Sequence, residues 1–234
     1  MPSGELTNPL LLRAMARGGK PLVVSTGMAT LGDIESALEV IAAELLPKLG
    51  KAAFWSQEGQ ELLRARVTLL HCTTEYPAPP ESVNLRAMIT MSTAFGIPVG
   101  YSDHTDGPAI SAAAVALGAV LVEKHFTLDC SLPGPDHEAS LDVAELAAFV
   151  SSLRAVRSAL GDGRKVPQPA EIENRAIARR SLVARRAIAP GELYSVENVT
   201  LKRPGTGVPA SRWDEMLGRP ANRAYAPDDL IDPY

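Results

Sequence analysis

Residues 98–104 read Pro-Val-Gly-Tyr-Ser-Asp-His, and residues 119–125 read Ala-Val-Leu-Val-Glu-Lys-His. Each is a short apolar run that ends in polar residues, as expected of a buried strand whose end reaches a surface. Two similar runs precede them, at 21–26 and 67–72. Each run is followed by a stretch with helical spacing of apolar residues, at about 31–46, 83–95, 108–117 and 143–160. Buried strands that alternate with helices predict parallel βαβ units.

The polar residues of these runs gather at the carboxyl ends of the predicted strands. They include Ser25, His71, Ser102, His104, Glu123 and His125. A (β/α)8 barrel builds its active site at that end of its strands. An open doubly wound sheet shares this feature, but the glycine-rich phosphate fingerprint expected after its first strand is missing here. We therefore predict an α/β fold of the TIM (β/α)8 barrel type.

The length of this α/β part predicts an incomplete barrel. Four βα units fit into residues 1–160, whereas a complete barrel has eight and typically spans about 250 residues. We therefore expect residues 1–160 to be the C-terminal portion of a barrel that lacks its N-terminal part. A linker is expected at 161–178 and a small, turn-rich β domain at 179–234.

A run of basic residues joins the predicted linker to the small domain. Five arginines and no acidic residue fall within residues 175–186. They are Arg175, Arg179, Arg180, Arg185 and Arg186. A solvated face is the simpler interpretation of this run, and a surface that attracts anions is the alternative.

The composition excludes several classes of protein. The chain has 234 residues, of which 46% are hydrophobic and 21% charged, and its formal net charge is −4. The negative balance argues against bulk nucleic-acid binding. No apolar run reaches the roughly 18 residues of a membrane helix, and the first residues do not resemble a secretory signal. Cys72 and Cys130 are too few for a disulfide scaffold, so we expect a reducing, cytoplasmic compartment.

His104 and His125 are the best candidates for chemistry. They lie one βα unit apart and should end neighbouring parallel strands, about 5 Å from each other. Two imidazoles in that arrangement can hold a divalent metal ion; a pair of hydrogen-bonded core histidines is the alternative. Side chains alternate along a strand, so Glu123 and His125 share one face while Lys124 points to the other. This orientation argues against a Schiff-base mechanism on Lys124.

Other combinations of reactive residues are less promising. Neighbours on a strand point to opposite faces, so neither Ser102-Asp103-His104 nor His71-Cys72 makes a nucleophile and its base. We interpret Cys72 as a small buried hydrophobic residue. The loop at 133–137 follows the last predicted strand, so Asp136 can reach the same edge, although a plain turn explains this loop more simply.

Several segments together resemble the sialic acid synthase family, which comprises N-acetylneuraminate synthases and N,N'-diacetyllegionaminate synthases. These segments are 2–5 (PSGE), 25–30 (STGMAT), 71–77 (HCTTEYP), 100–104 (GYSDH), 123–129 (EKHFTLD), 134–137 (GPDH) and 202–207 (KRPGTG). They cover essentially the whole chain in order. The resemblance implies a TIM-barrel synthase domain followed by an antifreeze-like (SAF) domain. It also implies a homodimer in which the SAF domain swaps over the partner's barrel.

The resemblance implies an enzyme as well, a transferase that forms a carbon–carbon bond. It would condense phosphoenolpyruvate with an N-acetylated amino sugar to give a nonulosonic (sialic-type) acid and phosphate. The sugar would be N-acetylmannosamine or a 2,4-diacetamido-trideoxy hexose. His104 and His125 match the ligands of a divalent metal, Mn2+ with Mg2+ or Co2+ as alternatives, which would polarise the sugar aldehyde.

The same motifs imply roles for further residues. Glu5 matches an acid that protonates the new alkoxide, and Glu123 belongs with the catalytic residues beside the histidines. Four residues match groups that hold phosphoenolpyruvate: Ser3, Ser25, Ser102 and Thr74, the last where some members carry asparagine. Tyr76 and Asp136 match sugar contacts. Arg203 matches the arginine that the swapped domain presents to the N-acetyl group in the neighbouring subunit.

The start of the chain departs from the family pattern. In the family the N-terminal half supplies lysines that neutralise phosphoenolpyruvate, and Met1 falls within the motif that follows them. A truncated, non-catalytic fragment whose SAF module binds a partner or a carbohydrate is therefore an alternative. A barrel aldolase acting on an aldose phosphate is a third, but its substrate calls for more basic residues at the strand ends.

Overall fold

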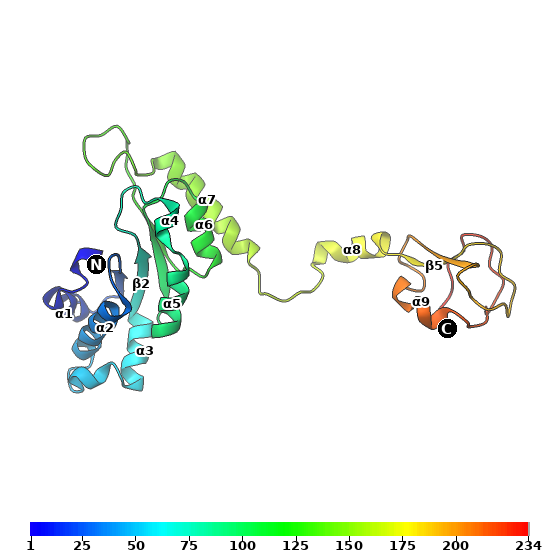
Figure 1. The fold of residues 1–234 in the computed structure, drawn as a ribbon, viewed down its shortest axis with the longest axis horizontal. Coiled ribbons are helices and arrows are strands. Elements are labelled where there is room, and N and C mark those ends of the chain that lie inside the picture. The colour runs from blue at the N-terminus through cyan, green and yellow to red at the C-terminus, as the bar shows by residue number, and fades with distance from the viewer. Residues whose placement is uncertain (234) are drawn as a thin grey trace. The chain divides into compact units, whose positions relative to one another are not determined.

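The computed structural model describes residues 1–233, which form two compact units: Met1–Gly163 and a second unit that begins at Arg164 (Figure 1). The first unit holds a four-stranded sheet and the second a two-stranded sheet. Among the described residues, no helix has both the length and the apolar character needed to span a membrane.

The first unit is built on a parallel sheet with the strand order β1-β2-β3-β4. Its strands are β1 (Leu22–Ser25), β2 (Val67–Cys72), β3 (Val99–Asp103) and β4 (Val122–Lys124). Every neighbouring pair is parallel, so all four carboxyl ends meet at one edge. The predicted strands and their order are therefore confirmed, as expected for consecutive units of a (β/α)8 barrel.

Helices precede, connect and follow these strands. They are η1 (Ser3–Glu5), α1 (Pro9–Arg17), α2 (Leu31–Leu45), η2 (Gly50–Ala53), α3 (Gln57–Arg66), α4 (Pro80–Val83), α5 (Arg86–Phe95), α6 (Ala109–Ala116) and α7 (Val143–Ala159). The ranges predicted for α2, α6 and α7 are confirmed to within one or two residues. The helix predicted at 83–95 begins later, as α5, and the short helix α4 precedes it; α4 ends at Val83 because Asn84 adopts a left-handed conformation, with φ of 51°.

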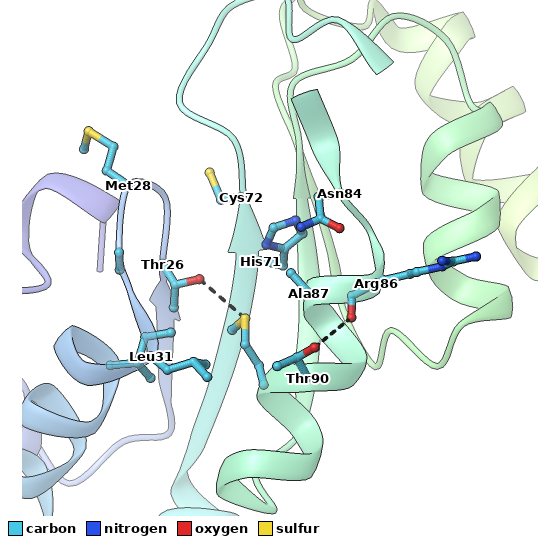
Figure 2. Close-up of a pocket in the computed structure, with 12 residues that line it drawn as sticks. Thr26, Met28, Leu31, His71, Cys72, Asn84, Arg86, Ala87 and Thr90 are labelled. Atoms are coloured by element: carbon cyan, nitrogen blue, oxygen red, sulfur yellow. Dashed lines mark hydrogen bonds between the residues drawn. The ribbon is translucent and has the colours of Figure 1, made fainter. Parts of the chain in front are cut away.

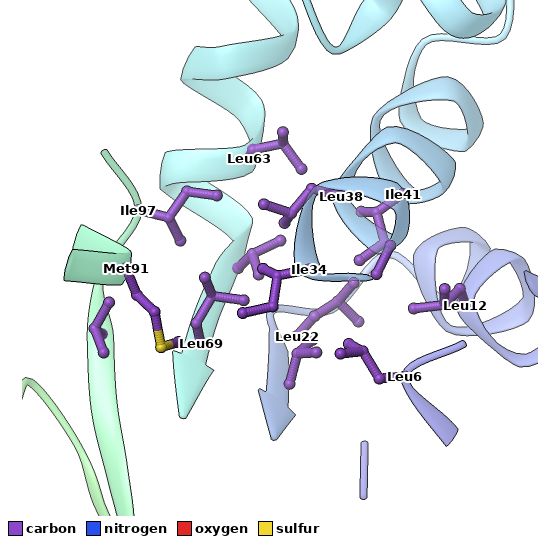
Figure 3. Close-up of a cluster of buried hydrophobic side chains, with 14 of the residues drawn as sticks. Leu6, Leu12, Leu22, Ile34, Leu38, Ile41, Leu63, Leu69, Met91 and Ile97 are labelled. Atoms are coloured by element: carbon purple, nitrogen blue, oxygen red, sulfur yellow. The ribbon is translucent and has the colours of Figure 1, made fainter. Parts of the chain in front are cut away.

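The hydrophobic core of the first unit lies where α2 packs on the sheet (Figure 3). Ile34, Leu38 and Ile41 recur at helical spacing along α2 and are at most 2% exposed. They belong to one cluster with Leu22 of β1 and Leu69 of β2. Burying each such side chain stabilises the fold by about 1.5–3 kcal/mol. This layer therefore supports the strands whose carboxyl ends carry the polar residues.

The second unit is small and rich in turns, as the sequence predicts. Its elements are α8 (Pro169–Ala178), β5 (Ser181–Ala184), β6 (Val199–Lys202), η3 (Ala210–Arg212) and α9 (Trp213–Met216). β5 and β6 pair in antiparallel fashion over a core that includes Leu182, Tyr194 and Met216. Helix α8 lies inside the range predicted as a linker. It begins at Pro169 and is capped by a reciprocal pair of bonds between Gln168 and Glu171.

Glu192 makes the stability of the second unit dependent on pH. Its carboxylate accepts hydrogen bonds from Arg186 Nη2 at 2.7 Å, from Ala189 N at 3.0 Å and from Asn198 Nδ2 at 3.1 Å. These bonds, chiefly the one from Arg186, lower the pKa of Glu192 from 4.5 to about 2. A carboxyl whose pKa falls on folding stabilises the fold above its unfolded pKa, and this contribution is lost as the carboxyl is protonated.

We therefore expect the second unit to lose stability as the pH falls from 4.5 towards 2, and to lose less in a Glu192→Gln variant. Urea unfolding followed by Trp213 fluorescence, in a Trp55→Phe background, measures the difference. The same pH dependence in both proteins would contradict this account of Glu192.

Candidate functional site

The two histidines meet at the carboxyl edge of the parallel sheet. His104 directly follows β3 and His125 directly follows β4. Their ring centroids are 5.2 Å apart and the rings are nearly perpendicular, at 77°. Both side chains are only half-buried, which separates them from a pair of histidines packed inside an apolar core. The residues that end adjacent strands thus share one partly open site.

The hydrogen bonds of His104 determine which ring nitrogen is free. Its Nδ1 lies 2.7 Å from the carbonyl oxygen of Thr73 and 3.9 Å from Cys72 Sγ. A carbonyl oxygen can only accept, so Nδ1 carries the proton and donates it. Nε2 is then the nitrogen with a lone pair. A backbone carbonyl that fixes the tautomer in this way is a common outer-shell partner of metal-binding histidines.

Tyr76 covers both imidazole rings. Its ring centroid lies 4.1 Å from that of His104 and 5.4 Å from that of His125. Burial raises the pKa of the Tyr76 hydroxyl, with smaller contributions from the nearby charges of Cys72, Asp136 and Glu123. The side chain nevertheless remains 50% exposed, so Tyr76 forms one wall of the site and its hydroxyl stays a neutral hydrogen-bonding group.

Ser102 and Glu123 are cross-strand partners on the same side of the sheet. Their Cα atoms are paired in the β3–β4 register, and Ser102 Oγ donates to Glu123 Oε1 at 2.8 Å. The predicted alternation places Glu123 and His125 on one face of β4. The bond from Ser102 agrees with this, since it places Glu123 on the face of the sheet that carries the histidines.

Asp103 and Lys124 are paired on the opposite face. Lys124 Nζ lies 3.5 Å from Asp103 Oδ2, and the two side chains are 4% and 0% exposed. Lys124 also donates to the carbonyl oxygen of Thr105, while Asp103 accepts from the backbone and hydroxyl of Thr105 and from the hydroxyl of Ser111. The prediction that Lys124 points away from the site is therefore confirmed, and a Schiff base there is excluded by geometry.

Ser3, Gly27 and Thr74 form a second polar group at this edge. Gly27 N donates to Ser3 Oγ at 3.0 Å, and Ser3 Oγ lies 3.7 Å from Cys72 Sγ. A Cβ atom on Gly27 would lie 2.4 Å from Thr74 Oγ1 and 2.8 Å from Ser3 Oγ. Only glycine lets the two hydroxyls approach the backbone this closely. Cys72, with contacts to both Ser3 and His104, connects this group to the histidines.

Replacing Gly27 with alanine is expected to destabilise the first unit by about 1–3 kcal/mol, because the added methyl group overlaps both hydroxyls. Urea unfolding measures this loss. Gly4→Ala is the control, since a Cβ there meets nothing within 4 Å, and its stability should change little. Equal stability of the two variants would contradict the close approach at Gly27.

Four further predicted site residues, Glu5, Ser25, Asp136 and Arg203, have the following positions in the structure. Glu5 accepts a hydrogen bond from Asn8 Nδ2 at 2.6 Å. Ser25 ends β1 and is 6% exposed. Asp136 is exposed in the loop after β4, where its carbonyl oxygen accepts from Ser140. Arg203 belongs to the second unit, where its Nε donates to Ala178 O at 2.9 Å.

His71 and Cys72 do not act together, as predicted. Figure 2 shows them on different sides of β2. His71 Nε2 lies 2.6 Å from Val83 O and borders a pocket of about 390 Å3 with Thr26 and Met91 among its other lining residues. No sequence pattern predicts that Cys72 contacts two site residues or that the Thr73 carbonyl orients His104. Both depend on loop geometry after β2.

The donor set fits a divalent first-row metal ion. Imidazole suits many such ions, and at nitrogen–metal distances near 2.1 Å two ring centroids on one ion lie within about 6 Å of each other. The separation of 5.2 Å satisfies this limit. Among the described residues there is no group of three or more His, Cys, Asp or Glu side chains that could hold a metal. His104 and His125 would therefore leave further coordination positions to water or substrate.

Comparison with known proteins identifies relatives of the whole chain. The model of the NeuB family matches residues 1–165, and that of the SAF domain matches residues 179–233. N,N'-diacetyllegionaminic acid synthase of Campylobacter jejuni is 47% identical over 99% of this chain and 64% of its own length. The human N-acetylneuraminate-9-phosphate synthase is 33% identical over 98% of this chain and 55% of its own length. The chain thus spans less than two thirds of these curated relatives.

Solved structures agree with this relationship. The spore coat polysaccharide biosynthesis protein spsE of Bacillus subtilis is 31% identical, with a TM-score of 0.57, over 98% of this chain and 64% of its own. An N-acetylneuraminic acid synthetase of Leptospira borgpetersenii, solved with citrate, is 34% identical, with a TM-score of 0.59, over 74% of this chain and 54% of its own. The chain therefore belongs to the NeuB family and carries a SAF domain at its C-terminal end.

Proposed function

We propose that this site condenses phosphoenolpyruvate with an N-acetylated amino sugar to form a nonulosonic acid and phosphate. The observation that carries the proposal is the pair of half-buried imidazoles, 5.2 Å apart, beside serine and threonine hydroxyls at the strand ends. Relatives named for the synthesis of legionaminic and neuraminic acids support this reaction class. N-acetylmannosamine and a 2,4-diacetamido-trideoxy hexose are the candidate sugars.

In this proposal His104 and His125 hold a divalent ion, Mn2+ in the first instance with Mg2+ or Co2+ as alternatives. Such an ion, when bound, acts as a Lewis acid on the sugar aldehyde and stabilises the developing alkoxide. The Thr73 carbonyl keeps the lone pair of His104 on Nε2. Tyr76, whose ring lies tilted against both imidazoles, and Asp136 hold the sugar.

The remaining residues bind phosphoenolpyruvate and move protons. Ser3, Ser25 and Thr74 donate hydrogen bonds to its phosphate and carboxylate, and Ser102 joins them by turning its single hydroxyl proton from Glu123 Oε1 to the substrate. C3 of phosphoenolpyruvate forms the new bond to the aldehyde carbon, and the alkoxide oxygen takes a proton from Glu5. Water then adds at C2 and gives one proton to Glu123, the cross-strand partner of Ser102. The C2–oxygen bond to phosphate breaks as the C2 hydroxyl becomes the keto group, and the hydroxyl proton leaves with the phosphate.

The proposal extends to assembly and location. In a homodimer with swapped SAF domains, Arg203 would meet the N-acetyl group of the sugar in the partner's site. The bond from Arg203 Nε to Ala178 O fixes the plane of the guanidinium and leaves its terminal nitrogens free to donate elsewhere. The two cysteines are free thiols, in keeping with a reducing, cytoplasmic compartment.

The test is a product assay on the chain with Mn2+, phosphoenolpyruvate and each candidate sugar. Mass spectrometry should detect a nine-carbon keto acid, formed in equal amount to the phosphate released. The product should disappear on chelation and in His104→Gln, and persist in His71→Gln, which retains a donor for Val83 O. Metal binding without any product would favour the alternative of a non-catalytic fragment whose SAF module binds a partner or a carbohydrate.

A further inference from the structure

The second unit contains a pocket that the proposed reaction does not use. It has a volume of about 370 Å3 and lies between α8 and residues 205–211. Three of its lining residues are arginines: Arg175, Arg179 and Arg180. Ile172 and Pro209 add apolar surface, and Ser211 adds a hydroxyl. Among the residues that the structure describes, no acidic side chain lines it.

The walls of this pocket are fixed by backbone contacts. Gly205 N donates to Ala176 O at 2.7 Å, and Ala210 N donates to Arg180 O at 3.1 Å. A Cβ on Gly205 would lie 2.7 Å from Arg179 Cβ, so α8 packs directly on the 205 backbone. The pocket is therefore part of the packing of this unit, and its arginines project from anchored backbone.

The three arginines of the pocket form no ion pair with the carboxylates of the described residues. Elsewhere in this unit Arg186, Arg212 and Arg223 each pair with a carboxylate. Among the ion pairs of the described residues, none involves Arg175, Arg179 or Arg180. Like charges four residues apart, as at 175 and 179, destabilise a helix.

The end of α8 does not require these cations either. Its carbonyl oxygens accept bonds from other donors: Ala176 O from Gly205 N and Ala178 O from Arg203 Nε. Among the described residues, the one hydrogen bond that the structure gives these three guanidinium groups is a long one, from Arg180 Nη1 to Leu201 O at 3.4 Å.

We propose that this pocket binds a small organic phosphate. Guanidinium groups bind phosphate oxygens through paired, charge-assisted hydrogen bonds, and Ser211 supplies a neutral donor. The apolar surface of Ile172 and Pro209 suits the carbon skeleton of a phosphate ester. The pocket is open on one side, since all three arginines are exposed, and its volume suits a small molecule; the net charge of −4 disfavours a polynucleotide.

The proposal is tested by titrating the isotope-labelled full chain with phenyl phosphate and following its amide resonances. The amides of Gly205 and Ser211 should shift and saturate, and inorganic phosphate should bind more weakly because it lacks the apolar group. Arg179→Gln should weaken binding about tenfold, the effect of one charge-assisted contact. Arg185→Gln removes the same charge from an exposed position outside the pocket and should leave the affinity unchanged.

Several results would overturn the proposal. These are the absence of saturable shifts at 205–211, equal weakening by Arg179→Gln and Arg185→Gln, or tighter and strongly salt-dependent binding of a single-stranded oligonucleotide. His104→Gln separates this site from the proposed active site, which also takes a phosphate. It should abolish product formation and leave the shifts at Gly205 and Ser211 intact.

Discussion

Replacing Lys124 with methionine is expected to destabilise the first unit by about 3–5 kcal/mol, because it leaves the carboxylate of Asp103 buried without its cation. The side chains are 4% and 0% exposed, so water cannot take the place of the ammonium group. Methionine keeps most of the volume of the lysine stem, which limits the cavity. The change in the free energy of unfolding, measured in urea, checks the expectation.

The double variant Lys124→Met/Asp103→Asn provides the control. Asparagine removes the buried charge and keeps an oxygen that can accept from Thr105, so the double variant should be more stable than Lys124→Met alone. The single variant Asp103→Asn completes the comparison. If the stability losses of Lys124→Met and Asp103→Asn simply add up in the double variant, the ion pair is contradicted. Because Asp103 and Lys124 precede His104 and His125 in paired register, the pair also bears on how the two histidines are aligned.

His125→Gln is expected to weaken Mn2+ binding by about 100-fold or more, since it removes one of two imidazole ligands. Titration of the chain with Mn2+, followed by the electron paramagnetic resonance signal of the free ion, measures this. The expected loss depends on a metal shared by His104 and His125, whose ring centroids are 5.2 Å apart.

His71→Gln is the matched control for that titration. His71 lies at the same edge of the sheet, but its ring contacts Val83 O, and glutamine can replace that donor. Its Mn2+ affinity should equal that of the unchanged chain. Equal losses in His71→Gln and His125→Gln would show nonspecific binding and contradict the site.

The sequence predicts the strands of the first unit well because their pattern is local. Each short apolar run ends in polar residues, and buried parallel strands impose this pattern on the chain itself. The alternation of side chains also correctly separates Lys124 from Glu123 and His125. The break between α4 and α5 escapes prediction, because the left-handed conformation of Asn84 has no strong sequence signature.

The candidate site is only partly predictable, because strand patterns are local in the sequence and the packing of loops is not. Strand order brings His104 next to His125, and spacing alone anticipates it. The contact of Cys72 with Ser3, and the space that Gly27 leaves for two hydroxyls, arise from loops that converge from distant parts of the chain. Helix α8 shows a further limit. The basic run at 175–186 gives no indication that three of its arginines line one pocket.

The central claim is that His104 and His125 bind the same divalent ion. Pulsed electron paramagnetic resonance of the Mn2+-loaded chain tests it most directly, since it detects nitrogen nuclei bound to the ion. The account predicts couplings from two imidazole nitrogens, reduced to one in either His104→Gln or His125→Gln and unchanged in His71→Gln. Mn2+ bound without nitrogen coupling, or with coupling that survives the loss of either histidine, would contradict it.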